Sequence, residues 1–242
     1  MSDSIASVLE NAIEKYQGLL KLRPNFVHRF YPDARRMNQQ ISPMAKTARY
    51  IPERWIASTV RAINPDPIPN EGLSMLDLPG TEITLKQALE LQGKYLLGEK
   101  RFEKHGGDFL VLTKILDPGI PIVFHLHASD QQVKNMPDHF IGHRFGKDEA
   151  YYFLSAPKGP CPYNHIGLYP WVEPDDLLER IELDDGSVLE TSPCFLQTYG
   201  EGALTQASLP HRPGTALTLE IQQPSDVYTL LEKGNAGESF SP

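Results

Sequence analysis

Hydrophobic positions follow a helical period in the first part of the chain. Over residues 4–20, apolar side chains recur three and four positions apart, with acidic and basic residues between them, which predicts an amphipathic helix. Residues 85–97 predict a second helix, since Thr84 and Gln87 have the spacing of a capping box and Gly98 is suited to end it. The first part of the chain is therefore expected to be helical at both of these places.

After the second helix the apolar runs become short and rich in β-branched and aromatic residues, separated by Gly, Pro and Asp, which predicts strands. The predicted strand segments are DFLVLTKIL, PIVFHLH, AYYFLSA, GALTQASL, TALTLEIQ and DVYTLLE. One short helix is expected in PDDLLERIEL, where Pro174 suits the first turn. Residues 49–74, with apolar runs broken by prolines, are predicted to be irregular.

Helices first and strands later indicate a mainly β fold with added helices, its strands forming a sandwich or a barrel. No internal repeat and no second domain is evident, so residues 1–242 are expected to form one domain. Its expected parts are an N-terminal helical extension over 1–40, a mixed helical and irregular segment over 41–106, and a β-barrel core over 107–233.

Charge and composition exclude several classes of protein. A net charge of −8 argues against nucleic acid as the main partner. No apolar run approaches the length of a membrane span, and the polar start is unlike a signal peptide. Two cysteines, Cys161 and Cys194, form no disulfide framework and are expected to be reduced thiols. We therefore expect a cytoplasmic protein that binds neither nucleic acid nor membranes.

Two histidines interrupt the apolar run IVFHLHASD. Side chains two apart on a strand point to the same face, so His125 and His127 should lie side by side, in one row with Val123. Two neighbouring imidazoles on a strand are half of a metal site. They could equally be core histidines that are satisfied by hydrogen bonds, so the pair alone does not decide between these interpretations.

Further ligand types occur near two other predicted strands. Glu149 lies at the entry to an aromatic strand, and His211 lies in a turn before another apolar strand. Three histidines and one glutamate suit zinc, iron or manganese and leave room for water or a substrate. Taken singly, Glu149 could be a solvated charge at a strand edge and His211 a surface histidine. His139, His143 and His165 are expected in loops, without a role.

The order of these motifs resembles the type I mannose-6-phosphate isomerases of the cupin superfamily. The most specific pieces are GKDEAYYFL and EIQQPSD, supported upstream by PERWIASTVRAINP and LKQALELQGKYLLG. The resemblance covers about residues 41–233 and has no counterpart to the C-terminal barrel of longer members. It implies a cupin-type double-stranded β-helix, or jelly-roll barrel, with added N-terminal and inserted helices.

The resemblance also implies a ligand set. His125 stands where the family has a glutamine ligand, and His127, Glu149 and His211 match its other ligands for one divalent metal ion. We expect zinc there, with iron or manganese as alternatives. Lys114 and Lys147 match lysines that line the family's active site.

Two positions depart from the family. The family's arginine after Ser-Asp falls on Leu230, and a serine that helps to hold phosphate falls on Val123. Arg212, next to a predicted ligand, is a candidate to replace the lost arginine. Losing an arginine near developing charge can slow a reaction by orders of magnitude. The metal site and the family's reaction are therefore separate expectations.

The leading functional hypothesis is a metal-dependent aldose–ketose isomerase. It would act on mannose 6-phosphate and fructose 6-phosphate, or a related sugar, through a metal-stabilised enediol, with Lys147, Lys114 and Arg212 as catalytic candidates. One alternative is a non-catalytic cupin that binds carbohydrate, and another is an iron-dependent oxygenase. The expected partner is a small sugar or sugar phosphate, and a homo-oligomer remains open.

Overall fold

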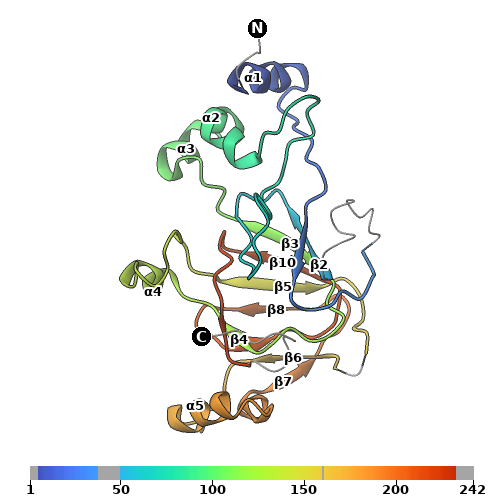
Figure 1. The fold of residues 1–242 in the computed structure, drawn as a ribbon, viewed down its shortest axis with the longest axis vertical. Helices are drawn as coiled ribbons and strands as arrows, with labels where there is room; N and C mark the ends of the chain where they lie inside the picture. The colour runs from blue at the N-terminus through green and yellow to red at the C-terminus, as the bar shows by residue number, and fades with distance from the viewer. Residues whose placement is uncertain (1–4, 38–49, 160, 233–242) are drawn as a thin grey trace.

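Two antiparallel sheets form the body of the molecule in the computed structural model, which describes residues 5–37, 50–159 and 161–232 (Figure 1). Residue 4 of the first predicted helix, residues 41–49 of the family resemblance and residue 233 lie outside this part. Within it, the six-stranded sheet has the order β1 (Phe26–Arg29), β2 (Tyr50–Ile56), β3 (Leu112–Leu116), β10 (Thr218–Gln222), β5 (Glu149–Phe153) and β8 (Gly202–Thr205). The five-stranded sheet has the order β11 (Thr229–Leu230), β4 (His125–Leu126), β9 (His211–Arg212), β6 (Tyr163–Ile166) and β7 (Cys194–Leu196).

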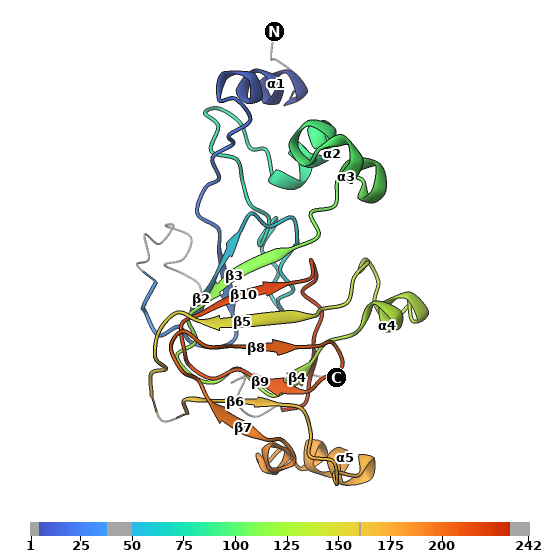
Figure 2. The ribbon, with the colours of Figure 1, turned by 180° about the vertical axis from the view of Figure 1, so that it is seen from behind.

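The helices lie outside the two sheets (Figures 1 and 2). They are α1 (Ile5–Lys15), α2 (Leu85–Leu97), α3 (Glu99–His105), α4 (Asp130–Asn135), α5 (Pro174–Leu183) and the 3-10 helix η2 (Ser187–Thr191). The helices α1 to α3 gather at one end of the molecule and α5 lies at the opposite end. A separate apolar core forms where α1 meets α2 and the segment before it, with Leu9, Leu76, Ile83 and Ala88 fully buried.

The sequence patterns predicted three of these helices well. Helix α2 has the predicted bounds and the capping box of Thr84 with Gln87. Helix α5 also has the predicted bounds, with Pro174 in its first turn. Helix α1 ends at Lys15, five residues before the predicted end. Helices α3 and α4 were not predicted, because each is too short to show a period of its own.

Five strands, β1, β2, β6, β7 and β9, lie where the sequence predicted none. The strand β2 occupies part of 49–74, which was predicted to be irregular, and β1 lies within the predicted helical extension. Both join the six-stranded sheet, so its strands begin at Phe26 rather than at the expected start of the core, residue 107. The prolines of this segment argued against a strand, so β2 was not predicted. In the structure β2 pairs with β1 on one side and with β3 on the other. The grouping of all residues into one domain stays a prediction.

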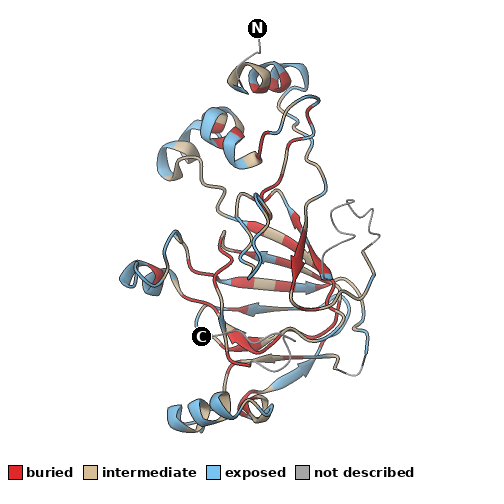
Figure 3. Ribbon diagram, in the orientation of Figure 1, coloured by how far each residue is buried: buried red, intermediate tan, exposed pale blue. Residues whose placement is uncertain are grey.

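Strands of the six-stranded sheet turn polar side chains inward. On β10, Thr218, Glu220 and Gln222 are buried, while Ile221 is 48% exposed. On β3 the buried face includes Lys114, which lies opposite Glu220 in the ladder. Burying charge is costly unless it is paired or serves a function. The buried parts of the strands in Figure 3 therefore include polar and charged residues as well as apolar ones. Such residues between the two sheets indicate a functional site there.

Candidate metal centre

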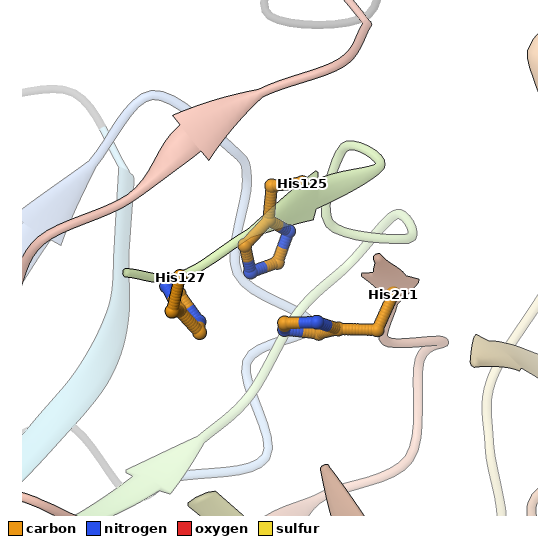
Figure 4. Close-up of side chains that lie close together, drawn as sticks. All are labelled: His125, His127 and His211. Carbon is orange, nitrogen blue, oxygen red and sulfur yellow. The ribbon is translucent and has the colours of Figure 1, made fainter. Parts of the chain in front are cut away.

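Three imidazoles meet between the sheets (Figure 4). His125 lies on β4 directly opposite His211 on β9, and His127 follows β4 by one residue. The ring centres of His125 and His211 are 4.2 Å apart, and each lies 4.9 Å from that of His127. One nitrogen atom of each ring lies within 4.8 Å of the corresponding nitrogen atoms of the other two rings. The structure thus brings together all three histidines that the sequence singled out.

Each of the three rings is oriented by a main-chain carbonyl. The Nδ1 atom of His125 lies 2.6 Å from the oxygen of Val123, that of His127 2.8 Å from Val227, and that of His211 2.8 Å from Leu209. A carbonyl only accepts, so Nδ1 carries the proton and Nε2 keeps a lone pair, which in His127 faces the ammonium group of Lys147 at 3.0 Å. Histidines that bind metals are typically held in this way.

Glu149 reaches the same place from the facing six-stranded sheet. Its Oε1 lies 2.8 Å from Nε2 of His211, and its Oε2 lies 3.3 Å from Nε2 of His127. The Tyr151 hydroxyl, two residues along β5, donates a hydrogen bond to Oε1. Three histidines on or next to the five-stranded sheet and one glutamate from the six-stranded sheet therefore converge.

Burial sets the charge of these groups. It lowers the pKa of His127 to about 3, helped by the positive charge of Lys147. Burial and the neighbouring histidines likewise hold the pKa of His125 well below its ordinary value. Burial alone would raise the pKa of Glu149, but Lys147 and the histidines hold it well below its usual range. At neutral pH the two imidazoles are neutral and the carboxylate is ionised, which are the forms that bind a metal.

The donor set fits a divalent first-row metal ion. Neither Nε2 of His211 nor Oε2 of Glu149 has a hydrogen-bond partner of good geometry, although Oε2 lies 2.8 Å from Nζ of Lys147. Buried polar atoms without hydrogen bonds are rare, and a cation shared by these atoms and the other two Nε2 atoms would satisfy them. Zinc, iron and manganese all accept three imidazoles and a carboxylate.

A cavity opens beside His125 and His127 and is lined by charged and aromatic side chains. Lys147 lies on it, with Nζ 3.0 Å from Nε2 of His127 and 3.4 Å from Glu220. Lys114 also lines it, 3.8 Å from Glu220. Both predicted lysines therefore face the cavity. Glu149 and Glu220 raise the pKa of Lys147 although burial alone would lower it, so this lysine stays a cation.

Glu220 is a candidate that the sequence reasoning did not assign. It is 3% exposed, lines the cavity, and its Oε1 has no hydrogen-bond partner. Burial raises the pKa of its carboxyl to about 7, although Lys114 and Lys147 act in the opposite direction. The sequence did contain a signal for this residue, because a glutamate stands between two apolar residues in the predicted strand segment TALTLEIQ.

Arg212 does not belong to the cavity lining. It follows His211 on β9, so its side chain points to the other face, where Nε lies 3.2 Å from Glu232. The two apolar replacements do face the cavity: Val123 and Leu230 both line it. Leu230 lies opposite His125 in the ladder between β11 and β4. His139, His143 and His165 lie outside the cluster, and His165 belongs to β6 rather than to the expected loop.

Among the described residues, the arginine that lines the cavity is Arg29, from the unpredicted strand β1. Its Nε lies 2.8 Å from Glu53 and its Nη2 2.7 Å from Asp226. Its Nη1 donates to the Ile63 carbonyl at 3.0 Å. Lys114 completes this group of charges, 3.9 Å from Glu53 and 3.6 Å from Asp226. One part of the cavity wall is thus a network of buried ion pairs.

The two-sheet barrel with a histidine cluster between its sheets is a cupin-type fold. No protein-family model matches the chain, and no curated protein matches its sequence. Solved structures of mannose-phosphate isomerases do match its fold. A protein assigned as a mannosephosphate isomerase from Archaeoglobus fulgidus matches with a TM-score of 0.65 and 17% identity, over 89% of this chain and 64% of that one.

Two further matches have the same character. The mannose 6-phosphate isomerase of Bacillus subtilis has a TM-score of 0.64 and 21% identity, over 88% of this chain and 60% of that one. A mutant phosphomannose isomerase from Salmonella typhimurium has a TM-score of 0.60 and 12% identity, over 88% and 70%.

These matches confirm the predicted fold class, a mainly β cupin-type barrel with added helices, and they confirm at the level of the fold the resemblance to mannose-phosphate isomerases. The chain spans less than two thirds of the length of the first two proteins that it matches. Among the helices of the described residues, none has both the length and the apolar character needed to cross a bilayer.

Proposed function

We propose that this protein is a metal-dependent aldose–ketose isomerase of the mannose-6-phosphate isomerase family. The observation that supports it is the convergence of His125, His127, His211 and Glu149 beside a cavity lined by charged groups. The likeness to mannose-phosphate isomerases supports the same reaction class. The metal is zinc in this proposal, with iron and manganese as the alternatives that the same ligands accept.

Isomerisation moves a proton between C1 and C2 of the sugar through an enediol. The metal ion, when bound, polarises the carbonyl and hydroxyl oxygens of the substrate and stabilises the negative charge that develops. The three histidines and Glu149 would hold this ion, and two of them, His125 and His127, also line the cavity. Lys147 lies next to both His127 and Glu149, where its ammonium group stabilises an oxyanion on the substrate.

Glu220 is the group best suited to carry the proton. In the metal-free protein, burial raises the pKa of this carboxyl to about 7, which brings its proton affinity close to that required of a general base at neutral pH. Its Oε1 accepts no hydrogen bond and lies 3.4 Å from Nζ of Lys147 on the cavity wall. Lys147 is less suited to be the base, because its raised pKa keeps it protonated.

Metal-loaded protein in D₂O, followed by NMR, tests this proposal. Mannose 6-phosphate with fructose 6-phosphate, free mannose with fructose, and lyxose with xylulose are the sugar pairs to try. We expect interconversion of at least one pair, with deuterium entering at C1 or C2, and we expect chelator-treated protein to lose the activity. Proton exchange with solvent is the signature of an enediol intermediate.

Failure of all three pairs with fully metal-loaded protein would reject the isomerase. Calorimetry would then separate the remaining possibilities. Sugar binding without turnover would support a carbohydrate-binding cupin, for which the apolar Leu230 and Val123 in the cavity wall are the supporting observation. Iron in the purified protein together with oxygen consumption would support an oxygenase instead.

A further inference from the structure

Every cation that the described part of the chain places on the cavity wall is already paired with carboxylates. The cations that line it, within the described residues, are Arg29, Lys114 and Lys147. Arg29 directs all three of its nitrogens to Glu53, Asp226 and the Ile63 and Asn64 oxygens. The two lysines each lie within 4.0 Å of at least two carboxylates.

The formal charge of the site leaves nothing for a further anion. The three cations face four carboxylates, those of Glu53, Glu149, Glu220 and Asp226. With all four ionised the sum is −1, and a divalent metal ion brings it to +1. The enediolate that forms during isomerisation carries one negative charge, which balances the remaining charge of +1. A phosphate group adds about −1.5 to −2 more, which in a buried site needs its own cations or amide donors.

The rest of the wall suits a neutral polyol. Aromatic rings of Phe30, Tyr31, Tyr151 and Tyr228 line the cavity together with apolar Val123 and Leu230. Pockets for neutral ligands are built in this way, from apolar surface and a few polar groups that fix orientation. Leu230 stands beside His125, so the wall next to a metal ligand is uncharged at this position.

We propose that the substrate of this site is an unphosphorylated aldose and its ketose, rather than a sugar phosphate. This inference rests on the proposed isomerase function and narrows its substrate class. A phosphate ester entering the cavity would have to break the pairs of Arg29, Lys114 or Lys147, or lie unpaired against Leu230 and Val123. Both cost more free energy than leaving phosphate in water.

The test compares kcat/KM of the metal-loaded wild-type protein for free mannose and lyxose with that for mannose 6-phosphate. We expect at least one free sugar to exceed the phosphate ester by 10-fold or more, with a KM that stays constant between 0.05 and 0.5 M salt. An equal or higher kcat/KM for mannose 6-phosphate would overturn the inference. It would direct attention to the second cavity, lined by Arg61, Lys86 and Arg144.

If none of these sugars is turned over, the isomerase proposal fails, and binding decides the present inference separately. Calorimetry with free mannose, lyxose and mannose 6-phosphate then gives the affinities directly. Tighter binding of a free sugar supports the inference. Tighter binding of the phosphate ester, or binding of none of the three, overturns it.

Leu230→Arg supplies an independent test, because it adds an uncommitted cation beside His125. We expect the ratio of kcat/KM for mannose 6-phosphate over free mannose, or of the two affinities, to rise at least 10-fold and to fall again in high salt. The matched control is Leu204→Arg on β8, where the leucine is 67% exposed, and it should change the ratio less than two-fold. A rise no larger than the control's would contradict the inference. The wild-type comparison stands even where the variant does not fold.

Discussion

The side chains that carry the proposed chemistry are buried polar groups on strands whose inward positions would ordinarily be apolar. His127, His211 and Glu149 are each at most 2% exposed. Buried polar groups of this kind stabilise the fold when each one has a polar partner within the cluster, and removal of one leaves the others without a partner. Single substitutions in this cluster should therefore affect metal binding far more than substitutions of exposed residues of the same type.

The first prediction concerns a ligand. His127→Ala should lower the metal content of purified protein from about one ion per chain to well below half, because one donor is lost and Glu149 loses a partner. Elemental analysis and a competition titration with a chelator measure this, and we expect affinity to fall at least 100-fold. His139→Ala, on the exposed loop after α4, is the matched control. Equal metal content in both variants would contradict the assignment.

The second prediction concerns Glu220 in the metal-free protein. A carboxyl whose pKa is raised from 4.5 to about 7 binds a proton more tightly in the folded state. This contribution is fully present below pH 4.5 and is lost as pH rises through about 7, and it amounts to about 3 kcal/mol. Glu220→Gln should therefore lose less stability than the wild type between pH 5 and pH 8 in urea denaturation. Parallel pH curves would show that the carboxyl titrates normally.

Residue types and spacing were enough to predict the ligands but not the cavity wall. The alternation in VFHLH predicted that His125 and His127 share a face, and the motif around Glu149 matched a known family. Glu220 was missed because the apolar pattern of TALTLEIQ gives Leu219 and Ile221 the core positions, whereas the structure turns them outward. Arg29 was missed because its partners, Glu53 and Asp226, lie 24 and 197 positions away.

At the scale of elements, β1 is fixed to the barrel by buried charge. Arg29 joins β1 to Glu53 on β2 and to Asp226, which precedes β11. The Tyr31 hydroxyl and the Trp55 indole both donate to Glu53 at 2.6 Å. A network of this kind specifies which strands pair and in what register, and breaking one member leaves buried charges without partners.

The third prediction follows from this network. Arg29→Met should lower the free energy of unfolding by about 3–5 kcal/mol, because Glu53 and Asp226 lose their strongest partner in a buried place. Chemical denaturation measures it. The control, Arg54→Met, removes an exposed arginine of β2 that lies over the Phe26 ring, and should cost less than about 1 kcal/mol. Similar losses in the two variants would mean that the buried network contributes nothing.

Elements with strong local signals were predictable and elements defined by their partners were not. The capping box and proline fixed the bounds of α2 and α5 without any tertiary information. The strand β9 is two residues long, was expected to be a turn, and is defined by its pairing with β4 and β6. No period can be read from two residues, so its place follows from the barrel, whereas β4 and β11 lie within the predicted segments PIVFHLH and DVYTLLE.

At the scale of the whole molecule, the metal ion would link the two sheets. Three of its candidate ligands belong to the five-stranded sheet and its surroundings, and Glu149 belongs to the six-stranded sheet. An ion held by both stabilises the folded state by mass action, by about 2.7 kcal/mol when its free concentration is 100 times Kd. The barrel and its cofactor should therefore be thermodynamically coupled.

The fourth prediction tests this coupling. Treatment with a chelator should lower Tm by roughly 5–10 °C for a chain of this size, and added zinc should restore it. Differential scanning calorimetry at matched ionic strength measures the shift. His127→Ala should show little response to chelator or zinc, which separates binding at this site from general effects of the ion. A wild-type Tm that ignores both additions would argue against a resident metal.

The main-chain partners of the three imidazoles have a consequence for how this barrel diversifies. The oxygens of Val123, Leu209 and Val227 orient the rings whatever side chains those positions carry. Exchange of these side chains therefore changes the packing around the three rings but not the acceptors that orient them, so the buried wall residue Val123 can vary while the imidazoles stay in place.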